Sequence, residues 1–410
     1  MEKLLSVESA KTIILEKFKA KNGVLLPIDQ SKGKILSSDI FAILNLPPFD
    51  NSSMDGFAVL SDNVRDASEE NPVELIIIED IAAGTAPKHH INPGQASRIM
   101  TGAPLPPGAD AVVPVEFTNF SDRYYQKELP SHIHVYKSVS QGDYIRPEGQ
   151  DIHAGEKIFS KGHKLRPQDL GFLAAQGFWE IDTVDQPVIA LLSSGDELTQ
   201  PGEALHPGKI YDSNTITIKS LLESFGSKVI DLGVAKDDFQ DIKNKLLNIQ
   251  ELNVDLLVST AGVSVGVYDL IRDVILENGN LSFWKVNIRP GKPLTFGEYL
   301  KIPFIGLPGN PVSAFVSALV FIKPIIYQLL GIQENLVLHS AILEEEINSD
   351  GRESYLRAEI SFNQGNYHAR LTSHQGSGNI FSLVCANALL IIPAGVKSVP
   401  KRNRVNFFWI

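Results

Sequence analysis

The alternation of strand-like and helix-like segments between residues 187 and 330 constrains the fold more than any other feature of this sequence. Short apolar runs are typical of buried strands, and they lie at 188–192, 228–232, 254–259, 281–288 and 304–305. Helices are predicted between them: one capped by Asp212-Ser213-Asn214 and ended by Gly226, and others at 238–249, 269–276 and 311–330. Because strand–helix–strand units set their strands side by side, this region predicts a parallel sheet with right-handed crossovers.

The segments on either side of this region are predicted to be mostly β-structure. Residues 6–19 form a predicted helix with Ser6 as N-cap, and Gly177 ends a second helix at 167–176. Apolar runs between Pro and Gly turns predict strands at 73–78, 111–115, 355–362, 367–372, 388–392 and 405–409. A chain of 410 residues is long enough for roughly two to four domains. We predict a multidomain α/β plus all-β protein, with domains at 1–43 with 142–176 (an elongated linker domain), 44–141 (β-rich), 177–330 (α/β) and 331–410 (a small β-barrel).

The charge balance argues against a broad nucleic-acid surface. The chain has 37 basic and 48 acidic side chains, a formal net charge of −11, whereas that binding mode needs a basic face. Charged residues interrupt the first 20 residues, which therefore lack the apolar core of a signal peptide. The apolar stretch at 315–322 is far shorter than the ~20 residues that span a bilayer. We expect a soluble cytoplasmic protein that binds neither nucleic acid nor membrane.

Several common kinds of site are excluded by residue type and spacing. The single cysteine, Cys385, rules out an intrachain disulfide and a Cys-rich metal site. It lies in the apolar run 381–392, so we expect a buried structural thiol rather than a nucleophile. His89-His90 is interpreted as a surface turn. Neither a dinucleotide-binding GxGxxG after a strand nor a P-loop GxxxxGK[ST] occurs.

Four polar loops each follow a predicted strand of the α/β region, at 193–197, 260–266, 289–293 and 306–311. Any one of them alone is explained as a tight connection. However, the carboxyl ends of parallel strands meet at one edge of the sheet, where open α/β folds bind ligands. Because four loops carrying both acids and bases converge there, we predict a binding site at this edge.

The last two loops have the chemistry of an anion site. Asn310 is a good N-cap, Gly309 allows close approach of backbone to a ligand, and Ser313 lies near the N–H groups of the helix that follows. Three cations lie close by in the sequence: Lys285, Arg289 and Lys292. On a chain of negative net charge they indicate phosphate or another oxyanion, with a solvated basic loop as the alternative.

Two carboxylates on neighbouring loops, Glu197 and Asp269, offer hard oxygen ligands. A partly hydrated Mg²⁺ held by one or two carboxylates and by ligand phosphates fits such a pair. Spacing alone also explains Asp269 as the N-cap of its helix. Outside the α/β region, the loops at 50–58 and 98–106 are equally rich in small polar residues. Their pattern alone does not separate a structured turn from a ligand-binding loop.

At these residues the sequence resembles the MoeA family of molybdopterin molybdenumtransferases, which includes the E domain of gephyrin. Seven motifs appear in family order, and the resemblance covers essentially the whole chain. They are DNSSMDGFA (50–58), RIMTGAPLPPGADAVV (98–113), RPEGQD (146–151), SSGDEL (193–198), GVSVGVYD (262–269), RPGKP (289–293) and GLPGNPVSA (306–314).

The resemblance implies a fold, a reaction and an assembly. The implied fold is a four-domain subunit with a MogA-like α/β domain. The implied reaction transfers molybdenum, as molybdate, into adenylylated molybdopterin, with Mg²⁺ and with release of AMP. The implied assembly is an elongated homodimer, in which the β-domain of one subunit completes a cleft between the α/β and C-terminal domains of the other. The pterin is then a small-molecule substrate, and the molybdopterin adenylyltransferase is a candidate partner.

The resemblance also marks individual residues. Those marked for catalysis are Asp55, Thr101, Asp151, Glu197, Asp237 and Asp269. Those marked for substrate or oxyanion binding are Ser264, Lys285, Arg289, Lys292, Pro293, Pro308, Asn310, Ser313, Arg357 and Ser377. By role, Glu197 and Asp269 would hold the metal, and Asp55 and Thr101 would reach across the dimer. Molybdate or phosphate would be held by Arg289, Lys292, Arg357 and Ser377.

Two residues depart from the family pattern. Ala261 stands where the family usually has a second glycine, so we expect a negative φ there. Arg289 stands where a lysine is common, which keeps the charge but favours bidentate oxyanion contacts.

Two other functions remain open at this stage. The α/β region alone resembles the adenylyltransferase that makes the insertase's substrate, although that smaller protein lacks the flanking β-domains. An interaction scaffold, as the gephyrin homologue is, would keep the fold while losing charged site residues; here Asp55, Glu197, Asp269 and Lys292 are all present.

Overall fold

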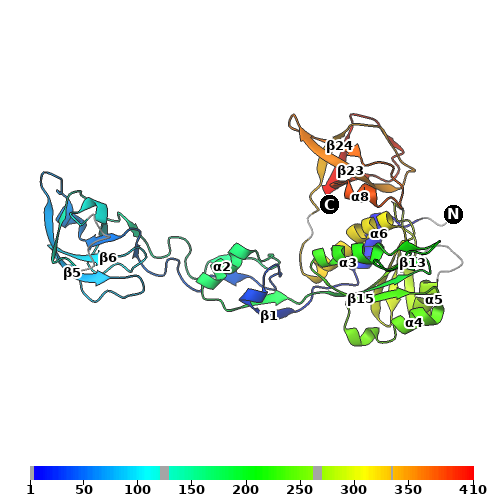
Figure 1. Cartoon of the computed structure of the whole chain (residues 1–410), viewed down its shortest axis with the longest axis horizontal. Coiled ribbons are helices and arrows are strands. Elements are labelled where there is room, and N and C mark those ends of the chain that lie inside the picture. The colour runs from blue at the N-terminus through cyan, green and yellow to red at the C-terminus, as the bar shows by residue number, and fades with distance from the viewer. Residues whose placement is uncertain (1–3, 121–128, 262–269, 334–335) are drawn as a thin grey trace. The chain divides into compact units, whose positions relative to one another are not determined.

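The computed structural model describes residues 4–120, 129–261, 270–333 and 336–410. The chain folds into two compact units, drawn in Figure 1. Unit 1 comprises Met1–Ser38, Lys161–Arg166 and Glu180–Ile410, and unit 2 comprises Asp39–Ser160 and Pro167–Trp179. The chain therefore leaves unit 1 and returns to it twice, so that residues far apart in sequence contribute to the same unit.

The α/β body of unit 1 is built on a six-stranded sheet of order β15-β12-β16-β20-β19-β17. The bounds are β15 Lys228–Ala235, β12 Val188–Ser194, β16 Leu256–Thr260, β20 Ile302–Leu307, β19 Thr295–Tyr299 and β17 Gly279–Phe283. The first four strands pair in parallel, as the alternating pattern predicts. The last two extend the sheet antiparallel, which the pattern did not predict. Leu300 and Lys301, both at positive φ, form the two-residue turn between β19 and β20 without the glycine that would have signalled a hairpin.

Side chains alternate between the two faces of the sheet and so build two separate cores. On one face Ile189 and Leu191 of β12 pack with α3 (Asn214–Ser224) and α6 (Pro311–Ser317). On the other face Ala190 and Leu192 pack with α4 (Phe239–Lys245) and α5 (Leu270–Glu277), and Figure 1 shows these two helices opposite α3. A sheet buried on both faces explains why its strands are continuous apolar runs.

The last helix of the body continues from α6 through a π-helical turn, Ala318–Ile322, into α7 (Lys323–Leu329). By length and composition this 19-residue segment, Pro311–Leu329, could cross a membrane. However, 72% of its apolar stretch is buried inside the fold, where it packs with the sheet in the larger core. The core helix of an α/β domain has the same composition, so the segment carries no indication of a membrane span.

Three predicted elements differ in extent from the structure. The helix α1 spans only Val7–Leu15, although Ser6 caps it as predicted by accepting a hydrogen bond from the Ser9 N–H. The predicted helix 238–249 is α4 followed by a 3₁₀ turn at Ile249–Leu252. The predicted strand 281–288 is two elements, β17 and the short β18 (Ile288–Arg289), because β18 leaves the large sheet and pairs with the C-terminal domain.

The C-terminal part of unit 1 is a closed β-barrel, as predicted. Its strands are β21 (His339–Leu343), β23 (Glu353–Asn363), β24 (Asn366–Leu371), β25 (Ala388–Ile392) and β27 (Arg404–Trp409). They close because β23 pairs with both β24 and β25. The expectation for Cys385 is wrong. It follows the short helix α8 (Phe381–Val384) and is exposed, since the apolar run 381–392 begins on the surface and only becomes buried in β25.

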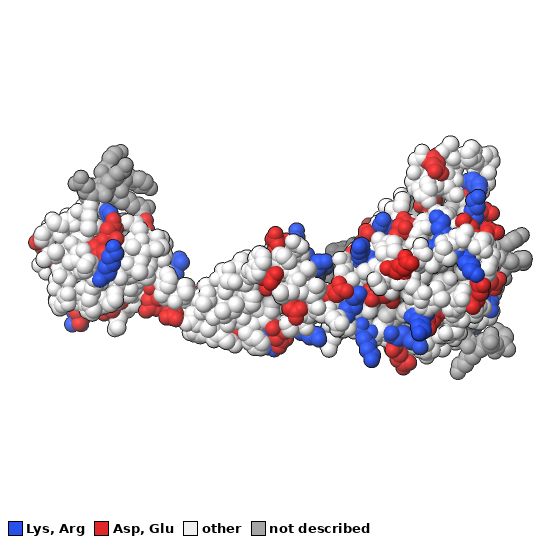
Figure 2. Space-filling view, turned by 90° about the horizontal axis from the view of Figure 1, so that it is seen from below, with Lys and Arg blue, Asp and Glu red and all other residues white. Residues whose placement is uncertain are grey.

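Unit 2 is β-rich, with a five-stranded sheet of order β7-β4-β6-β5-β8. The strands are β7 (Ala111–Pro114), β4 (Gly56–Val59), β6 (Gln95–Ile99), β5 (Val73–Ile81) and β8 (His132–Val135). Its helix α2 (Pro167–Ala175) stops before Gly177, which has a φ of 88°. Buried Gln176 ties this helix to the chain, because its Oε1 accepts hydrogen bonds from the Ile43 and Leu44 N–H groups. On the face drawn in Figure 2, acidic and basic side chains are interspersed.

Candidate functional site

A cavity of about 380 Å³ lies at the carboxyl ends of β12, β16 and β20. As predicted, all four strand-end loops contribute to its lining. The lining residues used below are Ser194, Glu197, Asp212, Thr260, Ala261, Pro293 and Asn310. The parallel pairing of these strands brings three of the loops together, since it places their carboxyl ends at the same edge. The 289–293 loop follows β18 outside this sheet, and it reaches the same edge because β19 begins there, antiparallel to β20.

A chain of buried hydroxyl groups runs beneath this cavity. Ser193 Oγ lies 2.6 Å from Thr260 Oγ1 and 2.5 Å from Thr215 Oγ1. Thr215 donates its hydroxyl to Asp212 Oδ2 at 2.5 Å and its backbone N–H to Asp212 Oδ1 at 3.0 Å. Because an ionised carboxylate only accepts, Asp212 sets the direction of the chain: Thr260 donates to Ser193 and Ser193 donates to Thr215. The floor of the cavity is therefore a rigid polar network.

The sequence analysis assigned Asp212 only to the cap of α3. The structure shows in addition a carboxylate that is 2% exposed and lies on the cavity lining. Ser213, the residue at the N-cap position, makes no side-chain capping bond, so Asp212 performs the capping. The sequence contained a signal for this role. An acidic residue three positions before a threonine at the start of a helix can accept hydrogen bonds from both the backbone N–H and the hydroxyl of that threonine.

The loop after β12 presents an acidic edge to the cavity. Glu197 is exposed and lines it, and its carboxylate folds back on Gly195, where a Cβ would lie 2.5 Å from Oε2. Asp196 and Asp237 exchange hydrogen bonds, since each backbone N–H donates to the carboxylate of the other at 3.2–3.3 Å. These bonds join the predicted residue Asp237 to the β12 loop. Asp237 itself is not among the lining residues of the cavity.

The expectation of a negative φ at Ala261 is wrong. Its φ is 74°, a left-handed conformation that glycine adopts at less cost. The reason is local crowding at the sheet edge: the Ala261 N–H bonds to Leu307 O, and a Cβ at Gly309 would lie 3.2 Å from the Ala261 Cβ. Two strand-end loops thus touch here through their backbones, and Ala261 is held in a strained conformation at the cavity.

The 289–293 loop approaches the cavity through Pro293 only. Gly291, with a φ of 105°, packs against Ser317 Oγ of the last helix, where a Cβ would lie at 2.6 Å. Lys292 is exposed, and the Lys285 ammonium lies over the Trp284 ring, 3.7 Å from its centroid. The structure therefore brings Pro293, Pro308 and Asn310 to the cavity, whereas these two lysines are outside its lining.

The start of α6 differs from the anion site that the sequence predicts there, because its first backbone donor is already occupied. Its first available N–H, on Val312, donates to Ser377 O at 3.1 Å, because Pro311 has none. Ser313 is buried, and Asn310 makes no side-chain capping bond. Ser377 therefore does meet this helix, as its assignment to the site requires, but through its backbone oxygen.

Arg357 is a fully buried cation in the C-terminal barrel. Its Nε donates to Ser382 Oγ at 2.9 Å and its Nη2 to Gly376 O at 3.0 Å. Burial lowers the pKa of its guanidinium to about 10, and the positive charge of Arg289 contributes in the same direction. Within the residues that the structure describes, no carboxylate forms an ion pair with Arg357 or Arg289. This part of unit 1 therefore holds two neighbouring cations, and the nearest recorded carboxylate is that of Asp350, which is paired with Arg352 and whose pKa the charge of Arg289 also lowers.

In unit 2 the structure joins two residues that lie 46 positions apart. Asp55 Oδ1 accepts hydrogen bonds from the Thr101 N–H at 2.9 Å and from its hydroxyl at 2.7 Å. The segments 50–58 and 98–106 are thus joined at this pair, in which Asp55 is half-buried and Thr101 is exposed. Asp151 is also exposed in this unit, where its N–H donates to Leu46 O.

Two predicted residues, Ser264 and Asp269, lie outside the described residues. Among residues 4–120, 129–261, 270–333 and 336–410, no group of three or more His, Cys, Asp or Glu side chains could hold a metal ion. The described part of the predicted magnesium site therefore consists of Glu197 alone.

This architecture is that of a multidomain α/β protein with a cavity at the sheet edge, and comparison with known proteins identifies its family. Family models match residues 5–177 (MoeA N-terminal region, domain I and II), 190–328 (probable molybdopterin binding domain) and 340–407 (MoeA C-terminal region, domain IV). The chain belongs to the MoeA family of molybdopterin molybdenumtransferases, and it is a transferase of molybdenum cofactor biosynthesis.

Individual relatives align over nearly the whole chain. Molybdopterin molybdenumtransferase 2 of Mycobacterium tuberculosis is 34% identical over 402 residues, 96% of each chain. The molybdopterin molybdenumtransferase of Haemophilus influenzae is 32% identical, over 95% of this chain and 94% of that one. A crystal structure of the molybdopterin biosynthesis MoeA protein from Pyrococcus horikosii superposes with a TM-score of 0.83 at 29% identity, covering 99% of both chains.

Proposed function

We propose that this enzyme inserts molybdenum, supplied as molybdate, into adenylylated molybdopterin and releases AMP in a Mg²⁺-dependent reaction. We place this reaction in the cytoplasm. The relatives named molybdopterin molybdenumtransferases support the transfer of molybdenum. The adenylylated form of the substrate and the release of AMP rest on the resemblance of the motifs, and chemical features of unit 1 support them.

The observation that carries the proposal is the buried Arg357 beside Arg289. A buried charge is costly unless an opposite charge compensates it, and here a second cation raises the cost. An oxyanion such as molybdate would remove this cost, because the planar guanidinium groups match oxyanion geometry. We therefore assign Arg289, Arg357 and Ser377, together with Lys292, to the oxyanion.

The cavity at the sheet edge is assigned to the adenylylated pterin. Glu197 offers carboxylate oxygens at its mouth, and Mg²⁺ is commonly bound by one or two carboxylates, with substrate phosphates and water completing the shell. Glu197, with Asp269 as its candidate partner, fits such an ion. When bound, the ion would supply positive charge against the phosphate oxygens. The hydroxyl chain from Thr260 to Asp212 keeps the cavity floor in place while the substrate binds.

A homodimer would supply the Asp55–Thr101 pair to the site of the other subunit. Asp55 accepts two hydrogen bonds from Thr101, and the Thr101 side chain remains exposed. Both units also leave large apolar side chains exposed, among them Leu25 (57%) in unit 1 and Trp179 (70%) in unit 2. Apolar side chains exposed singly are common on protein surfaces, so the proposed dimer rests on the resemblance of the motifs, with the adenylyltransferase as a further candidate partner.

The test is a single-turnover assay with adenylylated molybdopterin, molybdate and Mg²⁺ that measures AMP release and molybdenum incorporation. We expect both with the wild-type protein, and a loss of about 100-fold in Glu197→Ala, a typical cost of removing one charged active-site group. Glu203→Ala is the matched control, because Glu203 is exposed on the same connection and lies outside the cavity lining.

Two further variants separate the roles. Arg289→Gln should raise the molybdate concentration needed for half-maximal molybdenum incorporation. Thr101→Val should lower the turnover of the dimer, because the Asp55–Thr101 pair would act in the site of the other subunit. Wild-type protein that leaves the adenylate intact under these conditions would refute the proposed reaction.

A further inference from the structure

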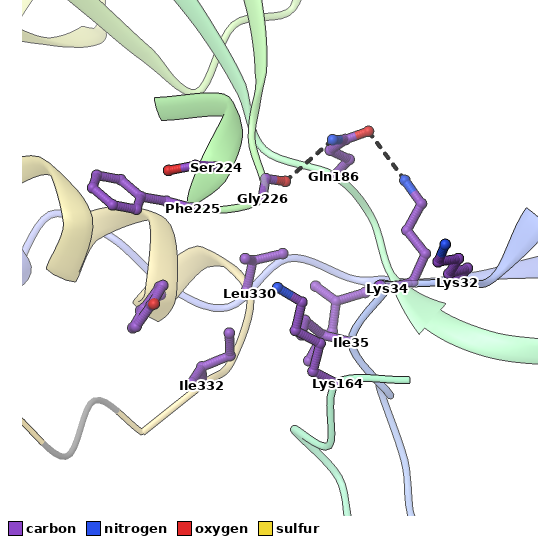
Figure 3. A pocket seen from close by; sticks show the side chains of 13 residues that line it. Lys32, Lys34, Ile35, Lys164, Gln186, Ser224, Phe225, Gly226, Leu330 and Ile332 are labelled. Atoms are coloured by element: carbon purple, nitrogen blue, oxygen red, sulfur yellow. Dashed lines mark hydrogen bonds between the residues drawn. The ribbon is translucent and has the colours of Figure 1, made fainter. Parts of the chain in front are cut away.

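A second cavity, of about 190 Å³, lies in unit 1 and shares no lining residue with the cavity at the sheet edge. Figure 3 shows its walls. They come from residues 32–35, Lys164, the pair Val184 and Gln186, and the carboxyl ends of α3 and α7. The first two of these lie on segments that lead along the chain into unit 2. Five separate stretches of sequence thus surround one cavity.

Three of the lining residues are lysines, Lys32, Lys34 and Lys164, and none is an acid. Lys32 and Lys164 are exposed, and in the part of the chain that the structure describes neither forms an ion pair or a side-chain hydrogen bond. On a chain with a net charge of −11, three uncompensated ammonium groups around one cavity create a local site of the opposite sign.

Lys34 is already positioned by the protein. Its ammonium donates to Gln186 Oε1 at 3.1 Å, and Gln186 Nε2 donates to Gly226 O at 3.2 Å, as the dashed lines in Figure 3 show. This relay connects the 32–35 segment to the end of α3. An ammonium group has three donors. Because the bond to Gln186 is its only side-chain hydrogen bond within the described residues, two donors remain for a ligand.

The remaining walls are apolar. Phe225, Tyr327, Leu330 and Ile332 line the cavity together with Ile35 and Val184. The volume is about that of six water molecules in the liquid, at roughly 30 Å³ each. It is enough for one ring with an oxyanion group, but it would leave an inorganic ion without contact to the apolar wall.

A competing reading is that the lysines only balance the negative ends of two helices. Both α3 and α7 end at this cavity, and cations are favourable there. However, the Gly226 carbonyl at the end of α3 is occupied by the Gln186 amide. Lys32 and Lys164 make no hydrogen bond to a helix-end carbonyl among the described residues, so their charge is left for a ligand.

We propose that this cavity binds a small organic anion, a phosphate monoester or carboxylate on a single ring. The oxyanion contacts Lys34, Lys32 and Lys164, and the ring lies on Tyr327, Leu330 and Ile332. Such a ligand holds the 32–35 segment and Lys164 against the ends of α3 and α7. The site is independent of the proposed transfer reaction, and binding to it does not require that reaction.

The test is calorimetric titration of the full-length protein with phenyl phosphate at millimolar concentration. We expect saturable binding that weakens roughly tenfold in the double variant Lys32→Gln/Lys164→Gln, since each lysine contributes a partly exposed charged contact. Lys401→Gln, an exposed lysine of the C-terminal barrel, and Arg289→Gln, at the proposed oxyanion site, should leave the affinity unchanged. The second control separates this cavity from the proposed active site.

Two further probes test the two halves of the proposed ligand. Phenol, which lacks the charge, and inorganic phosphate, which lacks the ring, should each bind at least about tenfold more weakly than phenyl phosphate. The proposal is overturned if wild-type protein shows no binding, if the double variant binds like wild type, or if either half binds as well as phenyl phosphate.

Discussion

The buried carboxylate of Asp212 provides the sharpest test of how the cavity floor is held. In Asp212→Ala the Thr215 N–H loses its acceptor at 3.0 Å and the Thr215 hydroxyl loses its acceptor at 2.5 Å. Thr215 is itself buried, so water does not readily replace these partners. The variant removes both the cap of α3 and the end of the hydroxyl chain that runs through Ser193 to Thr260.

The expected cost follows from these two contributions. Loss of a helix cap costs about 1 kcal/mol. Loss of a buried hydrogen bond to a charged group costs a further ~2 kcal/mol. The sum of about 3 kcal/mol corresponds to an increase of roughly 100-fold in the equilibrium for local opening of the first turn of α3.

Hydrogen exchange measured by mass spectrometry reports this opening directly. We expect peptides that cover the start of α3 to exchange roughly 100-fold faster in Asp212→Ala. Asp238→Ala is the matched control. Asp238 caps α4 by accepting a hydrogen bond from the Asp241 N–H at 2.9 Å, but it is exposed and is not part of a buried hydroxyl chain. Its loss should speed exchange at the start of α4 by only about fivefold. Equal effects of the two variants, or unchanged protection of α3, would show that the hydroxyl chain does not stabilise the floor.

Two further predictions concern strain and pH. Ala261→Gly should stabilise unit 1 by up to about 1 kcal/mol, because it relieves a φ of 74°, and a lower unfolding midpoint in urea would contradict this. Arg352 donates hydrogen bonds to the Asp350 carboxylate and so holds the pKa of Asp350 below its ordinary 3.8. A lowered folded-state pKa adds stability above pH 3.8 that is lost as the pH falls through the folded value. The thermal stability of wild type relative to Asp350→Asn should therefore be greatest near neutral pH and shrink in acid, and a difference independent of pH would contradict the ion pair.

How far the sequence predicted the fold depended on local signals. The continuous apolar runs of β12 and β16 predicted a sheet buried on both faces, and the structure has it. The strand β19 was missed because its turn, Leu300-Lys301, adopts positive φ without glycine or asparagine. Cys385 was wrongly expected to be buried because apolar composition does not show where a run enters the core.

For the candidate site, the sequence predicted the position of the loops but not which of their side chains line the cavity. Three of the strand-end loops were located from sequence because parallel pairing fixes where strand ends lie, whereas the 289–293 loop reaches the same edge through antiparallel β19, which the sequence did not predict. The lining of the cavity was not predicted from sequence. Pro293 reaches it while Lys292 remains outside, and this depends on the packing of Gly291 against the last helix.

The sequence by itself determined the order of most elements, the family and the edge of the sheet where the structure has a cavity, because these depend on short-range patterns and on motif order. Only the tertiary structure showed that Asp212 ends a chain of hydroxyl groups and that three lysines surround a second cavity. Each of these joins residues from separate segments. Their distances, burial and charges are set by how those segments pack, which no local pattern in the sequence encodes.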